Sequence, residues 1–159
     1  MGEASVILGV KIIRKGHSIL VFQEKYIEKL LKKFGYYDNS VCTPYDANSK
    51  LKKNIGESIS QTQYAQIIGS LLHLMSFSRP DFAYVVGRLS RYTQCPNQDH
   101  WDALARLMKY LRCTMDYAIE YNGFLTMLKG YNDANWIFDS YETKCTSGYV
   151  FTLRGGVVT

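Results

Sequence analysis

Apolar residues recur at two different spacings along this chain of 159 residues, and the spacings divide it into three segments. Residues 1–22 contain two short runs rich in Val, Ile and Leu, "ASVILGVKII" and "HSILVF", joined by "RKGH". Gly16 in this link can adopt the positive φ angle that a tight turn requires. The pattern therefore predicts a β-hairpin, in which Gly9 marks a bulge or a close approach of the backbone.

Residues 23–115 show the spacing of amphipathic helices. In "QEKYIEKLLKKFG", Ile27, Leu30, Leu31 and Phe34 fall on one helical face, and Gly35 is placed to end the helix. The stretch that follows, to about residue 58, has no clear period, and we expect it to form a long loop.

Three further amphipathic stretches follow this loop. The first begins with Ser60 and Gln63, a pair that predicts a capping box. The second restarts at Pro80, which suits the first turn of a helix. The third covers residues 97–114, and its Asp99 and His100 resemble a helix start more than a catalytic pair. Joined by short links, these helices should pack as a small bundle.

Residues 116–159 return to strand-like runs, "YAIEY", "LTMLKGY" and "SGYVFTL", with "NG" and "RGG" as turns. The last residues, "GVVT", read as another strand that stops with the chain. An incomplete sheet leaves an edge unpaired. We therefore expect a fragment of a larger β-rich unit at this end, and an α+β fold for the whole chain.

Composition and charge narrow the class of protein. The chain is 47% apolar and 21% charged, which is typical of a globular protein. The net charge is +5, but residues 1–115 carry sixteen Lys and Arg against nine Asp and Glu, whereas residues 116–159 carry three against five. A basic body of this kind favours a polyanionic partner, although a simply solvated lysine face explains it equally well.

The same composition bears on location. No apolar run approaches the ~20 residues needed to cross a bilayer, so we expect no membrane partner. The N-terminal residues do not have the pattern of a signal peptide. The four cysteines form no CxxC motif, which indicates unpaired thiols. We therefore expect a cytoplasmic or nuclear protein that is not secreted.

One residue stands out as a candidate for metal chemistry. Asp133, in "GYNDANW", comes just past the end of an apolar run, where it can be either a turn residue or a metal ligand. A two-metal site needs several carboxylates from different elements. The nearest in sequence, Asp139 and Glu142, are expected in a loop. The chain shows no complete catalytic constellation.

Several stretches together resemble the Pol polyprotein of copia-type LTR retrotransposons, in family order and spacing over nearly the whole chain. They are "ILGVKIIR", "QEKYIEKLLKKFG", "CTPYD", "YAQIIGSLLHLMSFSRPDFAYVVGRLSRY", "HWDALARLMKYLRCTMDY" and "GYNDANW…TSGYVF". The resemblance implies that residues 1–22 are the primer-grip-like hairpin of a polymerase palm. Residues 23–115 would then be a helical region like the thumb and connection, and residues 116–159 the truncated start of an RNase H-like domain.

The resemblance also implies roles for individual residues. Asp133 matches the first metal-binding aspartate of RNase H, and Mg²⁺ is implied for the full-length enzyme. A template–primer duplex of RNA and DNA would contact the thumb through its phosphate backbone, without sequence specificity. By helical face, the candidate contacts are Lys29, Lys32, Lys33, Arg88, Arg91, Arg106 and Lys109. Missing portions of the same polyprotein are further candidate partners.

The chain departs from the family pattern at four positions, Asn132, Asn135, Cys113 and Cys145, which replace the usual Ser, Asp, Gly and Ser. No "DD" pair of the polymerase occurs in the sequence. We therefore expect a catalytically incomplete chain that binds no cofactor by itself and at most binds nucleic-acid duplexes. The alternatives are a domesticated interaction protein without enzymatic activity and a non-functional translation product of a degenerate element. A secreted effector is a third alternative, but the absence of a signal-peptide pattern and the unpaired cysteines argue against it.

Overall fold

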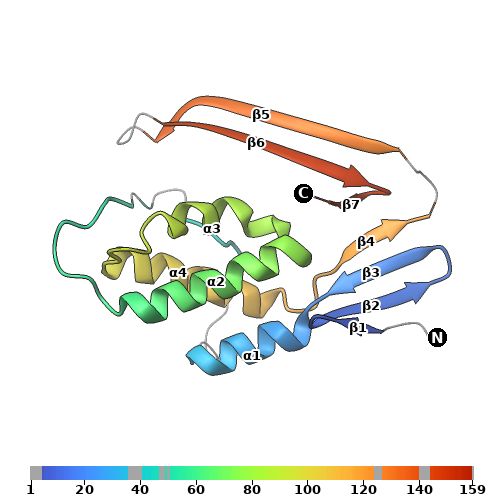
Figure 1. The fold of residues 1–159 in the computed structure, drawn as a ribbon, viewed down its shortest axis with the longest axis horizontal. Helices are drawn as coiled ribbons and strands as arrows, with labels where there is room; N and C mark the ends of the chain where they lie inside the picture. Colours follow the sequence, from blue (N-terminus) through green and yellow to red (C-terminus); the bar gives the residue numbers. More distant parts are fainter. Residues whose placement is uncertain are drawn as a thin grey trace.

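Figure 1 shows the computed structural model of the chain, which describes residues 5–35, 41–46, 49, 51–123, 127–139 and 144–158. It combines two antiparallel sheets with four α-helices among these residues. The elements in chain order are β1 (Val6–Ile7), β2 (Val10–Lys15), β3 (Ser18–Phe22), α1 (Glu24–Phe34), α2 (Gln61–Phe77), a 3₁₀ turn η1 (Pro80–Phe82), α3 (Ala83–Ser90), α4 (Gln98–Cys113), β4 (Ile119–Asn122), β5 (Leu128–Asp139), β6 (Lys144–Leu153) and β7 (Gly156–Val157).

The four helices pack around one apolar core. We call this group of helices the helical layer. α1 contributes the stripe that its sequence predicted, and its Ile27, Leu30 and Leu31 are buried. Gly35 ends α1 with a φ angle of 74°, which a residue with a side chain rarely adopts. None of the described helices has both the length and the apolar run that crossing a bilayer requires.

The helix ends differ from the sequence prediction in one place. The capping box of Ser60 and Gln63 is wrong: Ser60 has φ 45° and ψ 47°, and its side chain makes no capping hydrogen bond. Pro80 does open a helical turn, which is the 3₁₀ turn η1 that leads into α3. Cys113 is the last residue of α4, so the glycine usual in the resembling family is not needed there for a positive φ.

The predicted hairpin at the N-terminal end is present, and it pairs with a strand from far along the chain. In β2 and β3, Lys15 pairs with Ser18 around Gly16, whose φ is 55°. β3 also pairs with β4, from Ser18 opposite Asn122 to Val21 opposite Ile119. The first sheet therefore has the order β1-β2-β3-β4 and crosses the boundary expected near residue 116.

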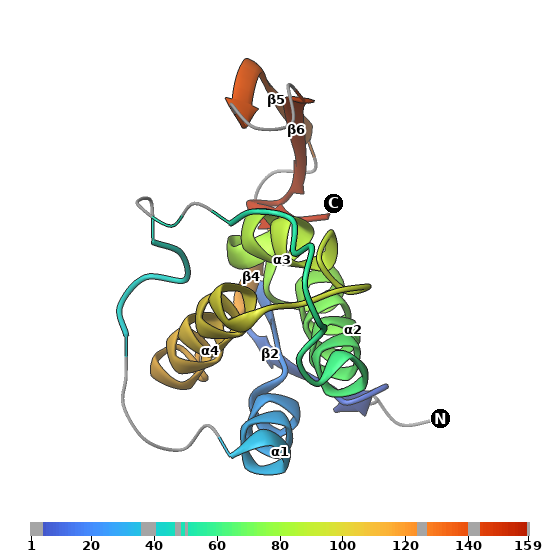
Figure 2. The ribbon, with the colours of Figure 1, turned by 90° about the vertical axis from the view of Figure 1, so that its left-hand side faces the viewer.

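The second sheet has the order β5-β6-β7, and we call it the C-terminal sheet. Its strands β5 and β6 pair from Leu128 opposite Leu153 to Asp139 opposite Lys144. Arg154 and Gly155, with φ angles of 53° and 80°, form the tight turn into β7. In both views the β5–β6 hairpin extends along the molecule apart from the helices (Figures 1 and 2).

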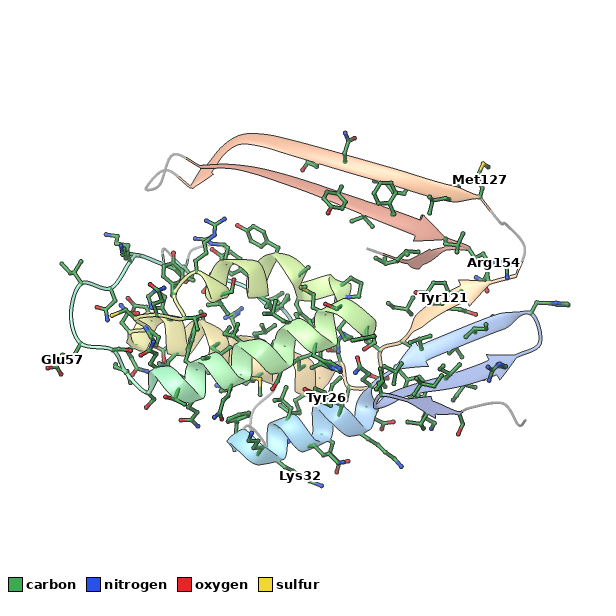
Figure 3. All side chains as sticks on the ribbon, in the orientation of Figure 1. Tyr26, Lys32, Glu57, Tyr121, Met127 and Arg154 are labelled. Atoms are coloured by element: carbon green, nitrogen blue, oxygen red, sulfur yellow. The ribbon has the colours of Figure 1, made fainter. Side chains whose placement is uncertain are left out.

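A small junction between β4 and β7 joins the two sheets. The backbone N–H of Asn122 donates to the carbonyl of Arg154 at 2.8 Å. The hydroxyl of Tyr121 donates to the carbonyl of Val157 at 2.8 Å, and Figure 3 shows Tyr121 close to Arg154. Gly156 lies against the Tyr121 ring, and a Cβ atom at this position would come within 2.5 Å of it.

Candidate nucleic-acid interface

The seven cationic residues predicted to contact a nucleic-acid backbone lie on three helices. Lys29, Lys32 and Lys33 belong to α1, Arg106 and Lys109 to α4, and Arg88 to α3, while Arg91 caps the end of α3. In both views α1 and α3 lie at opposite ends of the helical layer, with α4 between them (Figures 1 and 2). The structure therefore does not gather all seven on one surface.

Lys29, Lys32 and Lys33, three of the four lysines of α1, form the most exposed group of predicted contacts. Their side chains occupy the face opposite the buried stripe, and Figure 3 shows Lys32 pointing outward. The Nζ atom of Lys32 pairs with Oε1 of Glu28 at 2.5 Å, one helical turn away, and this hydrogen bond holds the pKa of Glu28 below its usual value. The Nζ atom of Lys33 lies 5.0 Å from the centre of the Phe34 ring. Of these three, Lys29 and Lys33 are exposed and form no ion pair with a carboxylate in the described structure.

Arg88 is half-buried and is used within the protein. Its Nη1 atom donates to the hydroxyl of Tyr45 at 2.6 Å and to that of Tyr84 at 3.3 Å. The guanidinium also lies over both rings, 5.4 Å and 5.9 Å from their centres. The Tyr45 hydroxyl in turn donates to the carbonyl of Ser49. Arg88 therefore holds the loop before α2 against α3.

Arg106 holds the same loop against α4. Its Nη2 atom donates to Thr43 Oγ1 at 2.8 Å, and its Nη1 atom lies 4.0 Å from a carboxylate oxygen of Asp46. A cavity of about 500 Å³ lies between the loop and α4, and Lys109 and Asp102 also line it. Helical periodicity did not predict this role for Arg88 and Arg106, because it reports which face a residue occupies and not which loop folds onto that face. Arg91 is exposed.

Asp133 lies within β5, opposite Gly148 of β6, and its side chain is exposed. Of the two alternatives that the sequence left open, a turn residue and a metal ligand, the turn is excluded, because the strand continues past Asp133 to Asp139. Asp139 likewise ends a strand and does not lie in a loop, and Glu142 lies outside the described residues. No group of three or more His, Cys, Asp or Glu among the described residues could hold a metal ion. Asp133 alone does not fit a Mg²⁺ site, because that ion needs several oxygen ligands.

A buried arginine that sequence analysis did not single out organises the base of the helical layer. Arg79 is 1% exposed, and its Nε and Nη2 atoms donate to the two carboxylate oxygens of Asp81 at 2.9 and 2.8 Å. Its Nη1 and Nη2 atoms also donate to the carbonyl and hydroxyl of Thr114 at 2.8 and 2.7 Å. The Tyr110 hydroxyl donates to Asp81 at 2.9 Å.

The hydrogen bonds and charge of Arg79 shift the pKa values of the groups around it. Burial would raise the pKa of Asp81, but the hydrogen bonds and the positive charge of Arg79 outweigh it, so the pKa of Asp81 is lowered. Burial, followed by the hydrogen bond to Asp81, raises the pKa of Tyr110. The network joins the turn before α3 to the end of α4, so we assign it a structural role and call it the structural centre of the helical layer.

His100 also has a structural role. Its backbone N–H donates to the Asn97 side chain at 3.2 Å, and its Nδ1 atom accepts the Asn97 backbone N–H at 3.0 Å. This is a capping box in which an imidazole takes the place of the usual Glu or Gln. The His100 side chain is buried, and burial lowers its pKa. The helix start expected here is confirmed.

Comparison with known proteins indicates the origin of this chain. It is 35% identical over 168 aligned residues to the retrovirus-related Pol polyprotein from transposon TNT 1-94 of Nicotiana tabacum. That match covers 99% of this chain but only 13% of the polyprotein. It is also 41% identical over 96 residues to the secreted RxLR effector protein 161 of Plasmopara viticola, a match that covers 60% of this chain and 68% of that protein.

The other two comparisons found nothing similar. No protein-family profile matches the chain, and no solved structure matches it. The origin therefore rests on the two sequence relatives. The chain belongs to the same family as the Plasmopara viticola protein, and its similarity along nearly its whole length to the tobacco polyprotein supports a retrotransposon Pol origin.

Proposed function

We propose that the chain corresponds to the last part of a reverse transcriptase running into the start of RNase H, and that it binds nucleic-acid duplexes through their phosphate backbone. In this proposal the first sheet contains the primer-grip-like hairpin, the helical layer corresponds to thumb and connection, and the C-terminal sheet begins RNase H. The observation that carries the binding proposal is the exposed lysine face of α1, on a chain of Pol origin with a net charge of +5.

The proposed contact surface is narrower than the seven residues that the sequence indicated. Arg88 and Arg106 hold the loop before α2, so a phosphate would have to compete with the partners they already have. Lys29 and Lys33 have no such competition from a carboxylate in the structure described, whereas Lys32 is paired with Glu28. Binding through so few lysines is weak, independent of sequence and sensitive to salt.

The test is a titration of an RNA–DNA duplex at several salt concentrations. Each lysine–phosphate interaction contributes about 0.9 to the slope of log K against log salt, so Lys29→Gln combined with Lys33→Gln should reduce that slope by about 2. The matched control is Lys52→Gln with Lys53→Gln, which removes two exposed lysines from the loop before α2. If both double variants lower the slope equally, the binding is diffuse and the α1 surface is not the site.

Catalysis by the isolated chain is not part of the proposal. Asp133 belongs to no group of three or more His, Cys, Asp or Glu residues in the described structure that could hold a metal ion. Purified chain with Mg²⁺ or Mn²⁺ and a labelled RNA–DNA hybrid should therefore show neither primer extension nor RNA cleavage. RNA cleavage that Asp133→Ala abolishes would contradict this expectation. The proposed location is the cytoplasm or nucleus, where such duplexes form.

The similarity to the Plasmopara viticola protein supports a second candidate function, that of a secreted effector. The observation that favours it is the 41% identity over 68% of that protein's length. Expression with a tag in intact cells, followed by assay of the medium and the cell fraction, separates the two candidates. Retention in the cells favours duplex binding, and recovery from the medium favours the second candidate.

A further inference from the structure

The outer edge of β5 is open in the described structure. β5 is the first strand in the order β5-β6-β7, and β7 is the strand that meets the rest of the molecule through β4. Figures 1 and 2 show β5 on the outside of the molecule. An edge strand presents a row of backbone N–H and carbonyl groups that can pair with another strand.

The charges along this edge have an internal symmetry. Lys129, Tyr131 and Asp133 alternate along the strand and so share one face of the sheet, and all three side chains are exposed, Tyr131 to 61%. Lys129 and Asp133 lie two residues before and two residues after Tyr131, and their charges are opposite. The pattern is therefore complementary to itself when the strand is reversed.

We propose that two copies of this chain pair edge to edge through β5, antiparallel, about a two-fold axis at Tyr131. In this register Lys129 of each copy lies directly opposite Asp133 of the other, and the two Tyr131 side chains face each other. Two identical ion pairs then flank a tyrosine pair on one face of a continuous sheet of six strands. A two-fold interface of this kind is closed and adds no further copies.

The charges select this register over its neighbours. Parallel pairing in register would place Lys129 against Lys129 and Asp133 against Asp133, and like charges directly opposite each other are destabilising. An antiparallel shift by one residue in either direction moves Lys129 away from Asp133. Charges on an edge strand usually block pairing. Here the opposite charges of Lys129 and Asp133 favour the one antiparallel register that places them opposite each other.

The opposite face of the strand tolerates the same pairing. Gly130 would lie opposite Asn132 of the second copy, which introduces no bulky clash. The Phe151 ring already covers Gly130 from β6, since a Cβ atom there would come within 2.8 Å of the ring. Leu128, Tyr149 and Phe151 are exposed beside it, so the pairing would extend this apolar surface across both copies. The contact is small, and the dimer should be weak and reversible.

A charge-swap experiment tests the proposal. Sedimentation velocity at low salt, with EDTA to keep metal ions from Asp133, should show wild-type chain whose average mass rises with concentration towards that of a dimer. Lys129→Asp and Asp133→Lys should each raise the dissociation constant about tenfold, because each places like charges opposite one another. The double variant restores opposite charges with the same composition and net charge, and it should dimerise like the wild type.

The double variant is also the control for folding, which far-UV circular dichroism of all four proteins checks. Addition of salt should weaken the wild-type dimer, because the ion pairs are exposed and therefore screened. Wild-type chain that stays monomeric at every concentration would overturn the proposal. The edge of β5 would then be available only to a strand of another polypeptide. Single variants that dimerise as well as the wild type, or a double variant that does not recover, would also overturn the proposal.

Discussion

The helical layer and the C-terminal sheet bury their apolar side chains to very different extents. In the helical layer, Leu104, Leu107 and Met108 are fully buried against neighbouring helices. In the C-terminal sheet, Leu128, Tyr149 and Phe151 are exposed. The difference shows that the amphipathic helices complete a core of their own, whereas the described large apolar side chains of the β5–β6 hairpin remain exposed on both faces.

The contrast extends to polar groups. The helical layer contains a buried arginine whose hydrogen bonds reach an aspartate, a threonine and, through the aspartate, a tyrosine. In the described part of the C-terminal sheet, Lys129 and Asp133 lie in solvent on the edge strand. We infer that the helical layer carries most of the stability of the chain, and that the C-terminal sheet depends on what pairs with it.

The largest predicted effect on stability is the difference between two Leu→Ala variants, one in the helical layer and one in the C-terminal sheet. Leu107→Ala leaves a cavity in the helical core and should lower the free energy of unfolding by about 2–5 kcal/mol. Leu128→Ala removes an equal side chain that is 59% exposed, and its cost should stay below about 0.5 kcal/mol. Urea unfolding followed by circular dichroism measures both. Equal costs would show that the hairpin is packed as tightly as the helices.

The helical region was the part of the fold that the sequence predicted best. The positions of Ile27, Leu30 and Leu31 and the stop at Gly35 are local information, and α1 appears between Glu24 and Phe34 as expected. The capping box at Ser60 failed although its pattern was suitable, because Ser60 has a positive φ and its side chain does not turn towards the helix. Short motifs predict a helix end but not the path by which the chain arrives there.

Contacts between distant segments were not predictable in the same way. β3 pairs with β4 across nearly a hundred residues, and nothing in either short run specifies the other. The boundary expected near residue 116 was drawn from resemblance, and the strand just beyond it hydrogen-bonds to the first hairpin. It remains a prediction about ancestry, since pairing in space does not report where one domain of a longer protein begins.

The candidate site was predictable only in its composition. Exposed lysines on α1 followed from helical periodicity, but the internal use of Arg88 and Arg106 required the position of the loop. Arg79 was not predicted because its hydrogen-bond partner Thr114 and the Tyr110 ring beneath its guanidinium lie more than thirty residues away along the chain. A turn remained an alternative for Asp133 because the apolar run before it stops, whereas β5 continues through polar residues.

The next largest predicted effect on stability comes from disrupting the buried hydrogen-bond network around Arg79. Arg79→Met removes the partner of Asp81 and leaves the Thr114 carbonyl without its donor, and the free energy of unfolding should fall by about 3 kcal/mol. This is the lower end of the range for a broken buried pair, because the Asp81 side chain is 34% exposed and water can reach it. Arg91→Met, the same change at an exposed arginine, should cost less than about 0.5 kcal/mol. Similar costs for the two variants would contradict a structural centre at Arg79.

The smallest predicted effect is a dependence of the stability of the helical layer on pH. Burial lowers the pKa of His100 in the folded chain below the value of about 6.5 expected when the chain is unfolded. The unfolded chain therefore binds more protons below that pH, and stability is lost as the pH falls from about 6.5 through the folded pKa. Protonation would also remove the lone pair with which Nδ1 accepts the Asn97 N–H. Asp81, whose pKa is lowered, loses its contribution only at pH values below about 3.8.

The two tryptophans allow this loss to be assigned to one region. Trp101 lies in α4 beside His100, and Trp136 lies in β5. In a Trp136→Phe background, the fluorescence of Trp101 should report unfolding at a lower urea concentration at pH 5.5 than at pH 7.5. His100→Gln keeps a side chain that can accept the Asn97 N–H but does not titrate, so it should flatten this dependence. A dependence that survives in His100→Gln would show that another group causes it, and the helical layer would then not owe its acid sensitivity to the cap of α4.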